Sequence, residues 1–208
     1  MRLYLAMIVF LLGIWQIGEG VWIHAKAQLA QVLIESAWAA TLEDKLTHKP
    51  WPWADTWPVA RMTIADEVLY TLEGAQGNSL AFGPGHLQGS VLPGRQGISI
   101  VGGHRDTHFG FLEHIKNGQE IYIEHKEGES RFTVQQISIR DSESELLRFD
   151  PGEDQIVLVT CYPFDALDAG GSLRYVVTAR RTGSDNRYSA GGKPTENLLA
   201  STVSKTAH

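Results

Sequence analysis

The feature that most constrains the fold is a series of short β-type segments that occupies most of the chain from Arg61 onward. Val, Ile, Thr, Tyr and Phe alternate with polar residues in these segments, a period typical of half-buried strands. Clusters of glycine, proline, asparagine and aspartate separate them, as in FGPGH, LPGRQG and DPGED. The expected strands lie at 61–72, 97–103, 120–125, 131–140, 154–160 and 173–181. Short strands at this spacing predict an all-β sandwich or barrel, with one short helix in HFGFLEHIK.

Charge and cysteine content exclude several classes of function. The 208 residues carry a formal net charge of −6, and the charged residues are scattered rather than gathered into a basic stripe, so nucleic acid is not an expected partner. Cys161 is the single cysteine, which leaves no internal disulfide and no CxxC zinc site. A dinucleotide-binding fold needs a glycine cluster that follows a strand and opens a long helix. No glycine cluster in this sequence has that place, which disfavours such a fold.

The amino-terminal segment has a different character from the rest. An apolar run from Leu3 to Ile17, broken only by Gln16, follows Arg2, and with the apolar residues after it the run reaches the roughly 20 residues that a membrane span needs. One interpretation is an uncleaved single-pass anchor in the inner membrane, with the remainder of the chain facing the periplasm or the outside. The alternative is a signal peptide cleaved after the AKA at 25–27. Apolar residues continue at helical spacing beyond that point, which favours the anchor.

Changes in composition divide the chain into four parts. Residues 1–46 are expected to form the anchor and a helical stalk. Residues 47–60 contain three prolines and three tryptophans, which stop a helix and indicate a linker. Residues 61–182 are expected to form the β domain. Residues 183–208 are rich in Gly, Ser, Thr and Asn and are expected to be a flexible tail.

Cys161 directly follows the apolar strand DQIVLVT and is the candidate for chemistry. A free thiol is mostly protonated at neutral pH, so a nucleophilic cysteine needs cationic neighbours. His104 follows a strand and two glycines in ISIVGGHRD, which lets the backbone turn and leaves the imidazole at the rim. Arg174 opens the strand RYVVTARR, and an antiparallel return from Cys161 would bring it to the same end, whereas Arg180 and Arg181 lie further away. From these residues alone, Cys161 is either a nucleophile or an inert strand thiol.

The stretch HRDTHFGFLEH also contains several residues of the kind that bind metals. His104 and His108 are four residues apart, a spacing that would suit two ligands on one helix. The two glycines and the strand pattern before them argue against a helix. We therefore expect no metal and no cofactor.

Three stretches, in the order GHRDTHFGFL, LVTCYPF and LRYVV, resemble the His, Cys and Arg motifs of the sortases, the membrane-anchored cysteine transpeptidases. The longer stretch LAFGPGHLQGSVLPGRQGISIVGGHRDTHF is similar to the single-sortase type of Gram-negative marine proteobacteria. The resemblance extends from about Val68 to Arg180 and includes the amino-terminal anchor. It implies a closed eight-stranded β-barrel with short helices and an amino-terminal membrane or amphipathic helix.

The resemblance also implies a reaction and a protein substrate. Cys161 would attack the bond between Thr and Gly in an LPxTG-like carboxy-terminal sorting signal and form a thioacyl enzyme. His104 would protonate the leaving amine and then help to deprotonate the incoming amine. Arg174 would hydrogen-bond the substrate backbone or the developing oxyanion. The sequence does not identify the amine that accepts the acyl group.

Five further residues are expected to support this site or to contact substrate, namely Thr160, Arg105, Asp106, His108 and Tyr162. Thr160 matches the last threonine of the family's TLxTC-like motif and is expected to orient the substrate or the thiol. Val157 replaces the first threonine of that motif, so this chain has no hydroxyl there. Arg105 and Asp106 are expected to pair or to organise their loop, and His108 is expected to be a non-catalytic neighbour.

Two alternatives stay open beside the transpeptidase interpretation. The first is a cysteine peptidase that releases the cleaved protein by passing the acyl group to water. The second is an inactive exported barrel that binds peptides without turnover. The presence of all three polar groups, at His104, Cys161 and Arg174, argues against the second alternative.

Overall fold

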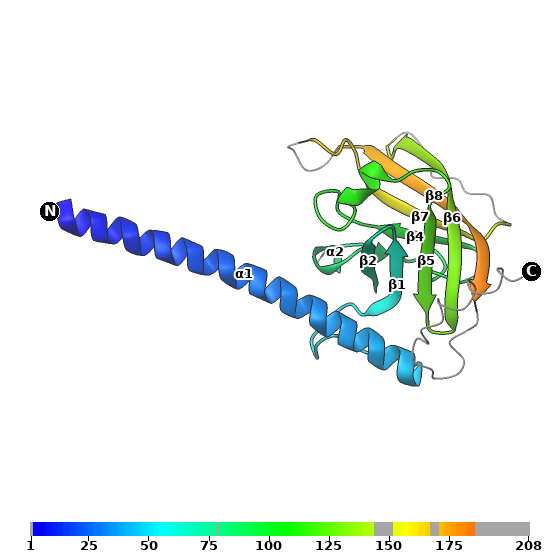
Figure 1. The fold of residues 1–208 in the computed structure, drawn as a ribbon, viewed down its shortest axis with the longest axis horizontal. Helices are drawn as coiled ribbons and strands as arrows, with labels where there is room; N and C mark the ends of the chain where they lie inside the picture. Colours follow the sequence, from blue (N-terminus) through cyan, green and yellow to red (C-terminus); the bar gives the residue numbers. More distant parts are fainter. Residues whose placement is uncertain (1, 78, 144–151, 167–170, 186–208) are drawn as a thin grey trace, which may run out of the picture.

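The strands close into an eight-stranded barrel, which confirms the expected fold class (Figure 1). The computed structural model describes residues 2–77, 79–143, 152–166 and 171–185. The strands follow one another around the barrel in the order β1-β2-β3-β4-β7-β8-β6-β5. Their bounds are β1 Pro58–Ile64, β2 Glu67–Glu73, β3 Gly85–His86, β4 Ile98–Gly102, β5 Glu120–His125, β6 Gly128–Asp141, β7 Gln155–Cys161 and β8 Leu173–Asp185.

The pairing of β4, β7 and β8 decides which loops meet. β4 and β7 are parallel, with Gly102 beside Val159, so the carboxyl ends of both strands lie at one end of the barrel. β8 is antiparallel to β7 and therefore begins at that same end. The opposite end of the barrel carries the start of β7, where Gln155 pairs with Arg180. We call these two ends the Cys161 end and the Arg181 end.

The barrel interior is filled by apolar side chains at alternate positions along each strand, the period of a pleated sheet. The core contains Ala60, Met62, Ile64, Val101, Ile121, Ile123, Phe132, Val134, Ile156, Leu158, Val177 and Ala179. Phe109 and Leu112, which lie beside and within the 3-10 helix η1 (Gly110–His114), are also fully buried. The short helix expected in HFGFLEHIK is therefore present and contributes to the core.

Two features of the first strands differ from the sequence expectation. The stretch 61–72 is a hairpin of two strands, because the chain reverses after Ile64 and Ala65 adopts a φ of 51°. β3 has only two residues and lies in FGPGH, which had the composition of a turn. Two residues cannot display a period, so β3 is visible only through its pairing with β2 and β4.

Helix α1 (Arg2–Asp44) contacts the barrel through its carboxy-terminal part, while its amino-terminal part projects away (Figure 1). Ile34 and Trp38 are almost completely buried, and the Trp38 indole Nε1 donates a hydrogen bond of 2.9 Å to the Glu124 carboxylate of β5. Gln31 donates to the carbonyl of Phe82 in the short helix α2 (Ser79–Phe82) at 2.8 Å. The end of α1 is therefore part of the packed domain.

In the part of the chain that the structure describes, no helix is both long enough and apolar enough to cross a membrane. The transmembrane anchor expected from the sequence stays a prediction. The tail expected at 183–208 lies outside the described residues from position 186 onward, while β8 extends to Asp185.

Candidate active site

Cys161 and Arg174 lie side by side at the Cys161 end. Cys161 is the last residue of β7, and its register partner in β8 is Arg174. The ladder continues past the cysteine, because the Tyr162 amide donates a hydrogen bond of 3.1 Å to the Leu173 carbonyl. The thiol is free and partly exposed. This pairing confirms the antiparallel return that the sequence predicted.

His104 comes to the same end through the parallel pairing of β4 with β7. The amide of Gly103 donates to the Val159 carbonyl at 3.1 Å, and the Thr160 hydroxyl donates to the Gly103 carbonyl at 2.8 Å. Both backbone groups of Gly103 are thus bound to the two residues before Cys161. A Cβ at Gly103 would lie 2.7 Å from the Phe109 ring, so a larger residue would displace the ring or the loop. His104, the next residue, is exposed beside the cysteine strand.

Arg105 points inward although its neighbours His104 and Asp106 are exposed. Its guanidinium donates to the carbonyls of Pro163 at 2.6 Å and Ala166 at 2.7 Å, both in the segment that follows Cys161. Its Nε lies 3.1 Å from the Asp106 carboxylate. Arg105 and Asp106 therefore form the pair that the sequence allowed, and Arg105 also contacts the loop after the thiol.

His108 and Tyr162 are the other two residues that the sequence assigned to the site. Burial lowers the pKa of His108 below its ordinary value of 6.5, and a nearby His104 charge lowers it further, whereas a hydrogen bond to the backbone of Ala81 opposes the shift. The neutral imidazole is therefore favoured at His108. Tyr162 stacks on Tyr175 with ring centroids 6.1 Å apart.

An aromatic group that the sequence reasoning did not single out adjoins Cys161. The Phe164 ring packs edge-on against the rings of Tyr175 and Tyr162, with centroid distances of 5.1 Å and 6.3 Å. Burial is the main reason that the pKa of Tyr175 is raised. The signal was present in the sequence, since aromatic residues flank both motifs in CYPF and RYVV. Tyr162, Phe164 and Tyr175 therefore form an aromatic group on the segments that carry Cys161 and Arg174.

Arg174, the register partner of Cys161, has no carboxylate among its described hydrogen-bond partners. Its Nη1 donates to the carbonyls of Gly171 at 2.8 Å and Leu173 at 2.9 Å. Backbone carbonyls satisfy N–H groups but do not neutralise a positive charge. The guanidinium can therefore still attract a developing negative charge on a bound carbonyl.

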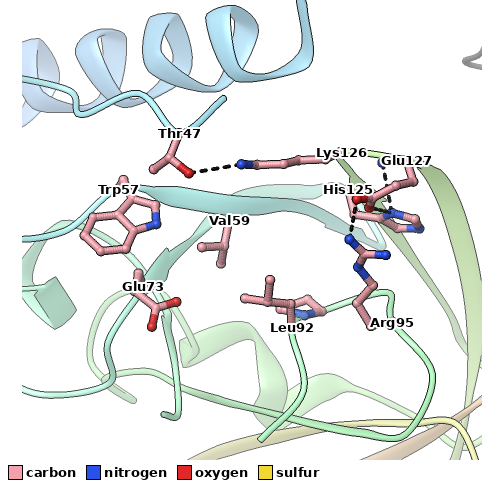
Figure 2. Close-up of a pocket in the computed structure, with 10 residues that line it drawn as sticks. Thr47, Trp57, Val59, Glu73, Leu92, Arg95, His125, Lys126 and Glu127 are labelled. Atoms are coloured by element: carbon pink, nitrogen blue, oxygen red, sulfur yellow. Dashed lines mark hydrogen bonds and ion pairs between the residues drawn. The ribbon is translucent and has the colours of Figure 1, made fainter. Parts of the chain in front are cut away.

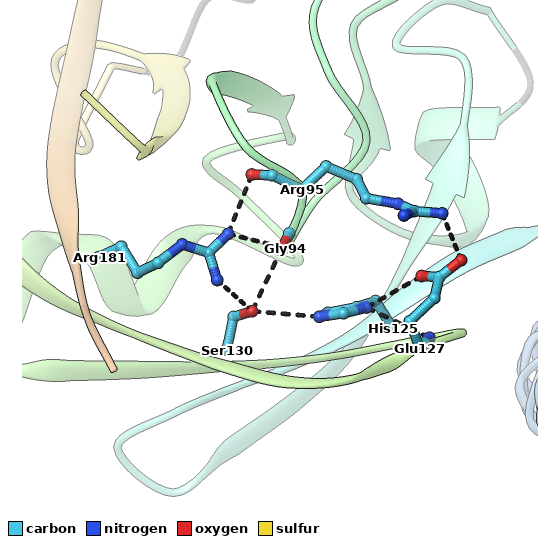
Figure 3. Close-up of polar contacts among 6 residues, drawn as sticks. All are labelled: Gly94, Arg95, His125, Glu127, Ser130 and Arg181. Atoms are coloured by element: carbon cyan, nitrogen blue, oxygen red, sulfur yellow. Dashed lines mark hydrogen bonds and ion pairs between the residues drawn. The ribbon is translucent and has the colours of Figure 1, made fainter. Parts of the chain in front are cut away.

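The other two arginines of β8 are bound at the Arg181 end, and Figure 3 shows the contacts of Arg181 with Ser130, Gly94 and Arg95. Arg181 contacts the Asp154 carboxylate at 3.0 Å, the Ser130 hydroxyl, and the carbonyls of Gly94 and Arg95 at 2.6 and 3.0 Å. Arg180 forms an ion pair with Glu153. Arg180 and Arg181 therefore differ from Arg174 in having carboxylate partners in the described part of the chain, and they lie further along the strand from Cys161.

The Arg181 end also contains a serine, a histidine and a glutamate in contact (Figure 3). The His125 Nε2 lies 3.1 Å from the Ser130 hydroxyl, and its Nδ1 lies 3.2 Å from the Glu127 carboxylate. Ser130 is only 1% exposed and also bonds the Gly94 carbonyl at 3.2 Å, so a substrate cannot reach its oxygen. Gly94 has a φ of 85° and a Cβ there would lie 2.3 Å from the His125 ring. The arrangement is structural.

A hollow of about 280 Å³ lies beside this network (Figure 2). Trp57, Val59 and Leu92 form its apolar lining, and the Lys126 ammonium at its edge donates to the Thr47 hydroxyl at 3.0 Å. Both acidic and basic side chains line it. None of the residues that line it belongs to the Cys161 end.

The family model described as the sortase domain matches residues 59–182, more than half of the chain, and the chain therefore belongs to the sortase family. The match begins in β1 and ends within β8, so it covers the barrel and both ends described above.

Individual relatives are also similar to this chain. Sortase D of Bacillus subtilis (strain 168) is 26% identical over 114 residues, which cover 54% of this chain and 57% of that protein. The chain thus spans somewhat more than half the length of this curated relative. The solved structure of sortase A from Corynebacterium diphtheriae is 34% identical with a TM-score of 0.56, and 64% of each chain is covered. That of sortase C-1 from Actinomyces oris is 30% identical with a TM-score of 0.52, covering 61% of this chain and 75% of that one.

Proposed function

We propose that this protein is a cysteine transpeptidase that uses Cys161 as nucleophile, His104 as acid and base, and Arg174 to stabilise the oxyanion. The observation that carries the proposal is the register of three adjacent strands, which brings these residues to one end of a sortase barrel. In the Arg181 end, by contrast, the serine that lies beside a histidine is buried.

The reaction begins when the Cys161 sulfur, as the thiolate, adds to the substrate carbonyl. The tetrahedral intermediate places a negative charge on the oxygen, where the guanidinium of Arg174 stabilises it. Collapse breaks the C–N bond, the leaving amine takes a proton from His104, and a thioester remains on Cys161. An incoming amine then loses a proton to His104 and displaces the sulfur, which restores the free enzyme and forms a new amide.

The finer parts of the proposal come from the sequence motifs and the family. We place cleavage between Thr and Gly of an LPxTG-like sorting signal, with transfer to an amine of the cell envelope. The resemblance of LAFGPGHLQGSVLPGRQGISIVGGHRDTHF to the proteobacterial single-sortase type supports assignment to that group. An inner-membrane location, with the catalytic domain on the periplasmic or outer side, belongs to the same proposal.

The test is incubation of the full chain with a fluorogenic LPxTG-type peptide, with and without an added amine such as triglycine. We expect a thioester on Cys161 in the mass spectrum and a ligated product that depends on the amine. If only the hydrolysed acid forms, the protein is a peptidase rather than a transpeptidase. If Cys161 reacts with a thiol reagent only after denaturation, it is not a nucleophile and the proposal fails.

A further inference from the structure

We propose that Arg105 is a positioning residue, which holds His104 beside Cys161 by binding the loop that follows the thiol. This inference rests on the proposed function, because it assigns to Arg105 the geometry of the pair that carries the reaction. Arg105 does not touch the reacting atoms in this role. It acts through the two loops that carry them.

The burial of Arg105 is unusual for its place in the chain. Its side chain is 4% exposed, whereas the Asp106 side chain that meets its Nε is 68% exposed. An ion pair with so exposed a carboxylate contributes little to stability. The stronger contacts are the two short hydrogen bonds, Nη1 to the Pro163 carbonyl and Nη2 to the Ala166 carbonyl. The charge is thus directed at the backbone of the cysteine loop.

A second contact, between strand β7 and the residue before His104, lies on the other side of His104. The Thr160 hydroxyl binds the Gly103 carbonyl at 2.8 Å, and Thr160 is 2% exposed. Gly103 and Arg105 flank His104, and Thr160 and Pro163 lie on either side of Cys161. His104 and Cys161 therefore each lie between two residues, and these residues are hydrogen-bonded across to the chain around the other.

The geometry of the acceptors explains the need for arginine. The two carbonyls belong to residues three positions apart and each receives a different nitrogen of one planar guanidinium. A lysine ammonium is a single point and cannot bind both along the same directions. An apolar side chain would fill the space but would leave two carbonyls without these donors. The side chain of His104 is itself exposed, so we expect its position to depend on the residues beside it in the chain.

The first experiment measures the rate at which iodoacetamide alkylates Cys161 in the full chain as a function of pH, in wild type, Arg105→Lys, His104→Ala and the double variant. This profile requires no substrate, so it tests the positioning even if peptide cleavage is not observed. We expect Arg105→Lys to shift the profile toward that of His104→Ala, and to change nothing further in the His104→Ala background. A profile identical to wild type in folded Arg105→Lys, or additive effects in the double variant, would overturn the proposal.

The second experiment measures peptide cleavage by the same proteins. We expect Arg105→Lys to lower kcat by about 10- to 100-fold with little change in KM, because a displacement of the order of 1 Å has that effect on a reacting pair. Arg180→Lys, which changes an exposed arginine of β8, is the matched control and should retain the wild-type kcat. A rise in KM with an unchanged kcat would contradict a positioning role for Arg105.

The Thr160 pair of variants decides the question if Arg105→Lys does not fold. Thr160→Val removes the hydroxyl that binds the Gly103 carbonyl while keeping the shape, and Thr160→Ser keeps the hydroxyl. We expect Thr160→Val to shift the alkylation profile in the same direction as the loss of His104, and Thr160→Ser to restore it. Equal profiles for the two variants would overturn the idea that bonds between these loops position the histidine.

Discussion

Arg174 and Arg181 are the same residue type on the same strand, yet they serve the two ends of the barrel in different ways. Arg174 meets backbone carbonyls beside a free thiol, while Arg181 meets a carboxylate, a hydroxyl and two carbonyls in a half-buried network. The Arg181 guanidinium also lies over the Phe132 ring at 4.9 Å. The partners, rather than the residue type, determine whether a charge is available for chemistry or used to join strands.

The same contrast applies to the two histidines at these ends. His104 is exposed, and the residues on either side of it are hydrogen-bonded to the chain around Cys161. His125 is enclosed by Ser130, Glu127 and the close approach of Gly94. A histidine that exchanges protons with a substrate needs access, whereas one that joins strands needs enclosure. The Ser–His–Glu contact at the Arg181 end shows that the order of residue types alone does not define a catalytic site.

The largest effect is expected from Cys161→Ala, which removes the nucleophile. No acyl-enzyme should form and cleavage should fall to background, while thermal unfolding should stay close to wild type because the thiol is partly exposed. Mass spectrometry after incubation with peptide measures the first quantity and circular dichroism the second. Ser130→Ala, at the opposite end, is the control and should retain acylation. Acylation of the Cys161→Ala protein would place the nucleophile elsewhere.

Arg174→Lys should lower kcat/KM by about 10²- to 10³-fold, because an ammonium does not reproduce the planar fork aimed at an oxyanion. Its unfolding free energy should change by less than about 0.5 kcal/mol, as is usual for an accessible side chain. Steady-state kinetics and urea unfolding measure the two quantities. Arg180→Lys, on the same strand, should alter neither. Wild-type turnover in Arg174→Lys would remove the distinction between the two ends.

Arg181→Met should show the opposite pattern. Loss of the guanidinium leaves the Asp154 carboxylate and the Gly94 carbonyl without these donors, and we expect a loss of about 1–3 kcal/mol in unfolding free energy. The folded fraction should keep its kcat/KM, because the start of β7 lies about 20 Å along the strand from Cys161. Urea titration measures the loss of unfolding free energy, and kinetics at urea concentrations below the unfolding transition measure kcat/KM of the folded protein. A catalytic defect without a stability defect would argue that this end takes part in the reaction.

The smallest effect is expected from the titration of His125. Burial is the main reason that its pKa lies below 6.5, with Arg95 and Arg181 adding to the shift and Glu127 opposing it. The unfolded chain therefore takes up this proton first as pH falls, so the stability present above about pH 6.5 is lost as pH falls toward the folded pKa. Urea unfolding across this window should show a shallower decline for His125→Gln than for wild type. Parallel declines would mean that His125 does not titrate differently in the two states.

The Cys161 end could be predicted from sequence because its geometry follows from strand pairing. An antiparallel return after Cys161 brings Arg174 beside it, and the structure has that pairing. The Arg181 end could not, since its network unites residues near positions 94, 125, 154 and 181 that meet only when the barrel closes. The partners of Arg105 were hidden for another reason, because backbone carbonyls leave no signature in residue type.

The parallel pairing of β4 with β7 also has a consequence for the order in which the protein acquires its activity. The hydrogen bond from Thr160 to Gly103 joins residues 57 positions apart, and such non-local parallel contacts form slowly, after local hairpins such as β5 and β6. A chain that has folded its hairpins but not this pairing carries an ordinary thiol, remote from any histidine of the site. We therefore expect the thiol of Cys161 to acquire the reactivity proposed above only once this long-range pairing has formed.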